Sequence, residues 1–292
     1  MEHTVTNAWS PAEDARNKAK YTRLFPTVYM LYRPKEKHDV YFRFSNRISR
    51  PANNMINPFI MYVNKYNSYQ GKPDLKPYYI YNAEVGYTFD NNLNVSLYYS
   101  QHSDGISQVS DIHETTSFKH TRWDNFLSER TLGVSNSYTF RTHWLQTFIQ
   151  HGVNYRRSVS DSETTSPKEA GWQYYASIRH TFYFNRSKTF IGTLSGSFQS
   201  KQKNANGTMD PTYNLTAGVR YGMLNNKLHL SLTGSNLLQS NYKGVYPSNG
   251  IPFYTNNSYM FTTLRLGVSY SFGASLRSSK RNYSNQDLQN RL

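Results

Sequence analysis

The feature that most constrains the fold is a two-residue alternation along residues 78–100, YYIYNAEVGYTFDNNLNVSLYYS. Apolar side chains such as Val85 and Leu97 fall on one face of each half, and mostly small or polar side chains fall on the other. This is the period of a β-strand with one apolar side. The Asp-Asn-Asn segment 90–92 divides the halves, and Asn and Asp tolerate the positive φ angles of tight turns. The stretch therefore predicts an antiparallel hairpin.

The same alternation recurs along most of the chain, in segments of about ten residues or more. Short turns near positions 34, 91, 142, 186 and 225 alternate with longer polar connections near 50–77, 113, 160, 205 and 245. A soluble β-sandwich would also alternate, but this order of turns and loops, with aromatic residues near the strand ends, is typical of a transmembrane β-barrel. We predict an all-β, antiparallel transmembrane β-barrel wall of about eleven strands, apolar toward lipid and polar toward the lumen.

Composition supports a barrel over a soluble domain. Only 37% of the 292 residues are hydrophobic, and the mean hydropathy is -0.75. A soluble domain of this size would need more Leu, Ile and Val for its core, whereas a barrel with a polar lumen needs apolar residues at only half of its positions. The 26 Tyr suit the boundary between acyl chains and headgroups, although their strand propensity alone would also favour them here.

Charge and cysteine content limit the partners. The net charge of +15 raises the possibility of nucleic-acid binding, but the basic residues alternate along strands and form no nucleic-acid-binding motif. We expect no nucleic-acid partner, and we assign the basic residues to the lumen and to anionic outer-membrane lipid. The absence of cysteine excludes disulfides and thiolate metal sites.

The chain divides into three parts. Residues 1–22 are polar without a strong period and are interpreted as an N-terminal segment or extracellular loop, with a short helix capped by Ser10 as the alternative. Residues 23–273 hold the barrel strands, and residues 274–292 form a basic C-terminal tail. The polar start lacks the apolar segment of a secretory signal, so we expect the chain to begin partway through a longer protein.

Strand parity leads to the same expectation. Closed single-chain bacterial barrels normally have an even number of strands, and short turns face the periplasm. An odd count that begins at the outer side predicts missing strands, and about eleven strands are half of a 22-stranded barrel.

No catalytic constellation is visible. The nine His residues are scattered without an HExxH motif, and Glu84 and Glu129 are the notable carboxylates within strands. We expect no enzymatic activity, no cofactor and no metal. If a ligand site exists, it lies where the lumen meets the long loops. The candidates are Arg43, Arg47, Tyr98, Arg179 and Arg220, and the alternative reading is a polar network that stiffens the wall.

Several ordered motifs resemble one family. Residues 44–51 (FSNRISRP), 57–59 (NPF) and 71–77 (GKPDLKP) are similar to successive motifs in the C-terminal barrel portion of TonB-dependent receptor-like outer-membrane proteins of Bacteroidetes. Residues 234–238 resemble a later motif, with Asn236 where an acid is usual, and residues 264–273 resemble the closing strand. The resemblance covers about residues 20–292.

The resemblance implies nutrient uptake across the bacterial outer membrane. It also implies an unknown nutrient ligand and, as partners, the missing N-terminal barrel half or plug, or a surface lipoprotein. The family's signal peptide, carboxypeptidase-regulatory-like sandwich and plug do not occur in this sequence. Two alternatives stay open: a self-contained small barrel acting as a pore, adhesin or structural protein, and a soluble basic binding module.

Overall fold

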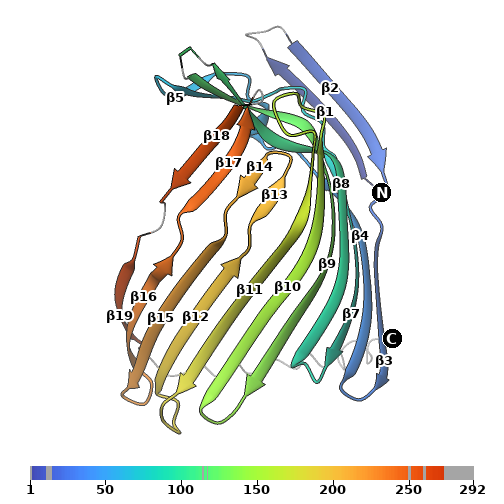
Figure 1. The fold of residues 1–292 in the computed structure, drawn as a ribbon. Coiled ribbons are helices and arrows are strands. Elements are labelled where there is room, and N and C mark those ends of the chain that lie inside the picture. The colour runs from blue at the N-terminus through green and yellow to red at the C-terminus, as the bar shows by residue number, and fades with distance from the viewer. Residues whose placement is uncertain are drawn as a thin grey trace, which may run out of the picture.

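Almost all regular structure in this protein is β-strand (Figure 1). The computed structural model describes residues 2–10, 15–113, 115–116, 118–248, 251–258 and 261–272, and of residues 2–23 it describes the backbone alone. Thirteen strands form the main sheet, in which β5 and β6 lie off the path and the other eleven follow one another as a continuous wall. The predicted antiparallel wall and its strand number are therefore confirmed.

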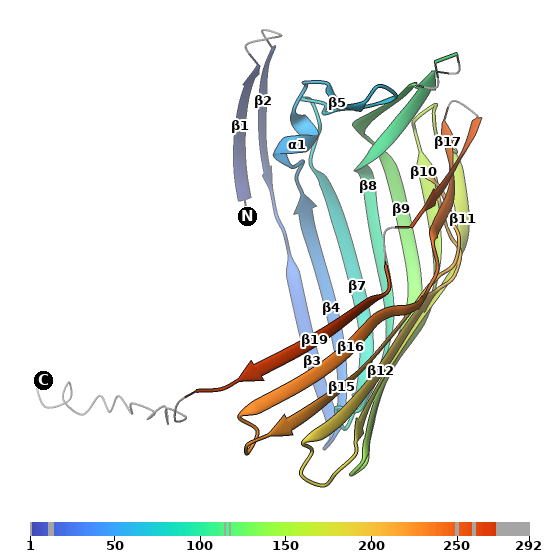
Figure 2. The same ribbon diagram turned by 90° about the vertical axis from the view of Figure 1, so that its left-hand side faces the viewer.

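The wall strands pair antiparallel with their neighbours along the chain. They are β3 (Thr27–Lys35), β4 (His38–Ser49), β7 (Tyr78–Phe89), β8 (Leu93–His113), β9 (Phe118–Arg141), β10 (Leu145–Ser160), β11 (Lys168–Tyr183), β12 (Phe190–Gln199), β15 (Thr212–Met223), β16 (Leu228–Gln239) and β19 (Thr263–Tyr270). β3 and β19 each pair on one side only, so the sheet curves but does not close (Figure 2).

The two ends of the wall differ. At the turn end, short turns join the strands, and at the loop end lie the long connections (Figure 1). The turn residues have the backbone angles that their sequence predicts: Asp90 and Asn91 have φ angles of 50° and 53°, and Asn225 and Asn226 have 55° and 64°. Short polar side chains lower the cost of this left-handed conformation, which sharp strand reversals require.

Cross-strand register separates the side chains into two faces. On the apolar face, Leu97 lies opposite both Val85 and Val134, and on the polar face Ser96 lies opposite Gly86 and Ser135. Leu97 is 51% exposed, whereas Ser96 is 3% exposed. Side chains converge on the concave face of a curved sheet and diverge on the convex one, so the polar face is the concave one. The apolar face is convex and no described part of the protein covers it.

Aromatic rings border the apolar face in two bands. On three strands the bordering residues lie eight positions apart: Tyr81 and Phe89, Tyr174 and Phe182, Tyr213 and Tyr221. Eight residues of strand span about 26 Å along the strand, which at the tilt of about 40° of barrel strands is about 20 Å in height, comparable to the apolar band of about 25 Å of an outer-membrane barrel. The tyrosine content that the sequence shows therefore marks the borders of the apolar face.

The loop end has more regular structure than the sequence predicts. It contains α1 (Asn53–Ile56), β5 (Met61–Asn64), β6 (Asn67–Gln70), β13 (Gln202–Asn204), β14 (Gly207–Met209), β17 (Tyr242–Ser248) and β18 (Ile251–Asn257). The last four form a separate sheet in the order β13-β14-β17-β18. The prediction of irregular loops near 205 and 245 was wrong, because these short strands have no membrane-facing side and so no apolar alternation marks them.

The N-terminal prediction also needs correction. β1 (Glu2–Ser10) and β2 (Ala15–Arg23) form an antiparallel hairpin where the sequence predicts a polar segment or loop. They pair only with each other, through backbone hydrogen bonds. Their sequence has no apolar alternation, so its pattern did not predict strands. The alternative helix falls partly on residues 11–14, which lie outside the described residues, as does the predicted tail 274–292. Among the described residues, no helix is long and apolar enough to cross a membrane.

Candidate functional site on the polar face and at the loop end

The five predicted ligand residues, Arg43, Arg47, Tyr98, Arg179 and Arg220, all lie on the polar face. They do not form one site. Arg43 and Tyr98 lie on either side of Glu84 in register, whereas Arg179 lies on β11 and Arg220 on β15, further along the sheet. Their role in ligand binding stays a prediction. For Arg43 and Tyr98, the contacts show how each residue interacts with the wall.

Arg43 belongs to a network that the wall itself completes. Its Nη1 lies 3.8 Å from Glu84 Oε2, and its guanidinium lies 4.5 Å from the ring centre of Tyr41. The Tyr41 hydroxyl donates to Glu84 Oε1 at 2.8 Å. These contacts join β4 to β7 and pair Arg43 with Glu84, the residue opposite it in register. They therefore favour a role for Arg43 in stiffening the wall.

Tyr98 packs over a glycine of the neighbouring strand. A Cβ atom added at Gly133 would lie 2.6 Å from the ring of Tyr98, and one added at Gly152 would lie 2.6 Å from the ring of Tyr175. Tyr41 covers Gly86 in the same way. Glycine leaves the space that each ring occupies, so Tyr98 has a packing role that sequence reasoning missed. The sequence signal that points to this packing is glycine at polar-face positions within long strands.

Further polar-face side chains, four of them on β9, β10 and β11, contain buried atoms without a hydrogen-bond partner among the described residues. Asn154 and Gln173 lie opposite each other on β10 and β11, and Arg156 and Glu129 lie one or two polar-face positions nearer the loop end. An unpaired buried polar atom costs about 1–3 kcal/mol, so this part of the concave face suits water or further polypeptide and not hydrocarbon. In the described residues, no group of His, Asp or Glu side chains could hold a metal ion.

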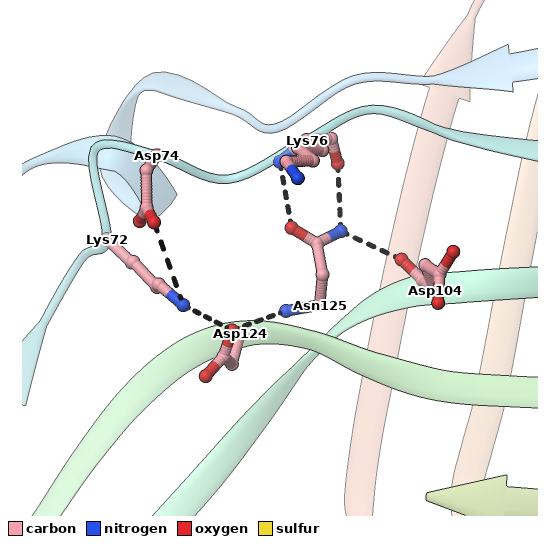
Figure 3. A network of polar contacts seen from close by, with 6 residues as sticks. All are labelled: Lys72, Asp74, Lys76, Asp104, Asp124 and Asn125. Carbon is pink, nitrogen blue, oxygen red and sulfur yellow. Dashed lines mark hydrogen bonds and ion pairs between the residues drawn. The ribbon is translucent and has the colours of Figure 1, made fainter. Parts of the chain in front are cut away.

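At the loop end, residues of the GKPDLKP motif fasten the long connection between β4 and β7 to the wall (Figure 3). The Lys72 ammonium lies 2.7 Å from Asp124 Oδ1 on β9. The Asn125 amide accepts from the Lys76 backbone N–H at 2.8 Å and donates to the Lys76 carbonyl at 2.9 Å and the Asp104 carbonyl at 2.8 Å. The connection is therefore held against β9, and the same Asn125 amide also joins β9 to β8.

β8 and β9 continue well past the apolar face and form one wall of a cavity. They have 21 and 24 residues, whereas a strand needs only about 9–11 residues to cross a bilayer. We name this cavity of about 470 Å³ the outer cavity. Its lining residues are Ser107, Gln108, Val109, Ser110, Ile112, Lys119, Trp123, Thr165, Asn206, Tyr246, Pro247, Ser248, Phe253, Thr255 and Asn257.

Hydrogen bonds between distant segments hold the outer cavity together. The Ser248 hydroxyl donates to the Ser110 carbonyl at 2.7 Å, and the Asn206 amide donates to the Ser107 hydroxyl at 2.6 Å. Lys119 Nζ lies 5.1 Å from the ring centre of Phe253, and burial lowers the pKa of this ammonium. The sequence predicted none of these residues as ligand-binding, since they come from segments that it showed only as polar connections or strand extensions.

The open antiparallel wall, with an uncovered apolar face between aromatic bands and a polar concave face, defines the protein as a section of a transmembrane β-barrel. The sequence matches the model of the outer membrane protein beta-barrel family over residues 1–270, and the chain belongs to that family. It is therefore a protein of the bacterial outer membrane.

Solved structures share this fold. The FrpB iron transporter from Neisseria meningitidis superposes with a TM-score of 0.55 at 14% identity, over 89% of this chain and 40% of that one. FpvA of P. aeruginosa, bound to heterologous pyoverdines, superposes with a TM-score of 0.52 at 13% identity, over 88% of this chain and 34% of that one. Both are TonB-dependent receptors, so the resemblance to that class is confirmed for the fold. No curated protein matches the sequence.

Proposed function

We propose that this chain is a wall section of a TonB-dependent-receptor-like transporter that takes up a nutrient across the outer membrane. The observation that carries the proposal is the open wall itself: eleven strands with a polar concave face and two unpaired edges. A wall of this curvature encloses a lumen only when further strands complete it. The chain has no catalytic role in this proposal.

The two edges support completion by further strands. Every described residue of β3 is exposed, and so are most residues of β19, because neither strand has a neighbour on its outer side. Unpaired edges cannot persist within hydrocarbon, where each open backbone group costs several kcal/mol. A wall of 22 strands would need as many strands again, and the chain spans less than half the length of the receptors with this fold.

The proposed partners follow from this geometry. An N-terminal barrel half would pair with β3 and β19, a plug would meet the unpaired polar atoms of the concave face, and a surface lipoprotein would contact the loop end. The nutrient would first meet the loop end, where the outer cavity opens. Lipid surrounds the apolar face, and no nucleic acid is involved.

Uptake can be tested without knowing the nutrient. The source bacterium and a strain lacking residues 27–270 of this protein are grown in complex medium, with and without a protonophore, and depletion of solutes is followed by mass spectrometry. We expect at least one solute whose depletion needs both this protein and the proton gradient. Identical depletion profiles in the two strains would contradict a role in uptake.

A further inference from the structure

We propose that the outer cavity binds a small organic anion, a carboxylate joined to a ring or other apolar body, and that Lys119 pairs with the carboxylate. The inference rests on the proposed function, because it takes the loop end as the side that meets solutes. It adds to that function the chemical class of the ligand and the residues that recognise it.

Among the described residues, the positive charge in the outer cavity has no carboxylate paired with it. Lys119 lies on β9 between β8 and β6, and its side chain is half-buried. Within the part of the chain that the structure describes, no carboxylate pairs with it, whereas Arg122 pairs with Asp111 and Lys72 pairs with Asp124. Burial lowers the pKa of the Lys119 ammonium. A partly desolvated ammonium binds a carboxylate more strongly than an exposed one does.

The rest of the lining suits an apolar or ring-shaped body. Trp123, Tyr246 and Phe253 supply aromatic surface, and every described lining residue except Lys119 is uncharged. Side chains such as Gln108 and Thr255 offer neutral hydrogen-bonding groups around the rings. The volume of about 470 Å³ falls within the range of about 300–1,000 Å³ that small-molecule sites occupy.

Other ligand classes fit less well. A cation or a bare metal ion would meet a positive charge and no carboxylate among the lining residues. A neutral sugar could stack on the aromatic rings, but it would leave the Lys119 ammonium unpaired. An organic anion satisfies both the charge and the rings, and so it is the class that the lining favours.

The test compares acids with their own amides. Outer membranes from cells that make the full chain are incubated with radiolabelled benzoate, 3-phenylpropanoate or indole-3-acetate, or with the corresponding primary amide, and binding is measured at equilibrium. We expect at least one acid to bind about tenfold or more tightly than its amide, since a charge-assisted hydrogen bond is worth that much. No saturable binding of any acid, or equal affinity for every acid and its amide, would overturn the proposal.

Variants assign the preference to Lys119. Lys119→Met should remove the preference for the acid, and Lys119→Arg should keep most of it. Lys243→Met is the matched control, because Lys243 lies exposed on β17 and does not line the outer cavity. Each variant is first checked for wild-type abundance in the outer membrane and an unchanged protease pattern. An unchanged acid preference in Lys119→Met would overturn the inference.

The two proposals fail separately. Binding is measured in membranes and needs no transport, so an acid preference that depends on Lys119 can persist when the depletion profiles of the two strains are identical. That result would remove the uptake function alone. Protein-dependent uptake together with equal acid binding by the wild type and Lys119→Met would remove the inference alone.

Discussion

Several single side chains on the polar face pack against the neighbouring strand. Tyr41, Tyr98 and Tyr175 each cover a glycine on the next strand, and the Arg43–Glu84 pair lies beside the first of these rings. A ring that fills the space beside a glycine stiffens the sheet, because its contacts with the glycine backbone take the place of side-chain packing in a core. These three tyrosines of the polar face therefore have a packing role.

The glycine gaps can be tested by filling one of them. Gly133→Val would place a side chain where the Tyr98 ring lies, and overpacking of this kind costs about 1–3 kcal/mol. We expect the free energy of unfolding of the protein, reconstituted in lipid vesicles, to fall by that amount in urea titrations. Gly171→Val is the matched control on the same face, because nothing lies within 4 Å of a Cβ atom there, and it should change stability much less. Equal losses in both variants would show that the ring contact is not the cause.

The assignment of one face to lipid and the other to the lumen can be tested on a single strand. Along β15, Val219 belongs to the apolar face and is 44% exposed, whereas Thr216 lies opposite Ser195 on the polar face. A charge on the apolar face has to enter hydrocarbon, and a charge on the polar face meets water. Side chains only three residues apart therefore have opposite tolerance for arginine.

Val219→Arg should hinder membrane assembly and Thr216→Arg should not. Near the bilayer midplane an arginine on the lipid side costs about 2–4 kcal/mol. The measurement is the fraction of each variant that folds into lipid vesicles, compared with the wild type. Equal folding of the two variants would overturn the assignment of the faces.

The connection between β4 and β7 is a separate element with its own fastening. Its strand β6 pairs with β9, and residues 71–77 are joined to β9 through Lys72 and through the two hydrogen bonds between Lys76 and the Asn125 amide (Figure 3). Because the contacts of residues 71–77 with the wall are few and polar, this end of the connection can open while β6 stays paired with β9.

Asn125→Ala should loosen this connection and leave the wall intact. The change removes three hydrogen bonds, each worth about 0.5–1.5 kcal/mol. We expect faster proteolysis within residues 50–77 in limited-digestion experiments, with no change in the resistance of the strands. Lys201→Met, which removes an exposed ion pair at the same end, serves as the control and should not accelerate cleavage. Uniformly faster digestion of the whole chain would contradict a local role for Asn125.

At the scale of the whole molecule, the described wall is a curved sheet with two unpaired edges, and the size of the barrel depends on what pairs with them. β3 and β19 border the opening (Figure 2). If they pair with strands of another polypeptide segment, the wall becomes part of a large barrel. If they pair with each other, the result is a small closed barrel with an odd number of strands, which is unusual in bacterial outer membranes.

Introduced cysteines distinguish these outcomes, because the native chain has none. Leu31→Cys on β3 and Arg265→Cys on β19 place thiols on exposed edge residues of the polar face. With a short bismaleimide in native outer membranes, we expect each single variant to crosslink to polypeptide outside residues 27–270. Ile178→Cys on the apolar face of β11 should not crosslink to polypeptide. A crosslink between positions 31 and 265 in the double variant would favour the self-contained small barrel.

Local patterns in the sequence determined the strand number, the tight turns and the two faces of the wall. Asp90, Asn91 and the alternation around Val85 express these features within a few residues, because turn angles and strand periodicity depend on neighbouring positions. The packing of Tyr98 over Gly133 and the sheet of β13, β14, β17 and β18 depend on pairing between distant segments. The bond from Ser248 to Ser110, which closes the outer cavity, joins residues 138 positions apart. No local periodicity of the sequence encodes such contacts, so only the tertiary structure brings Lys119 and Phe253 together.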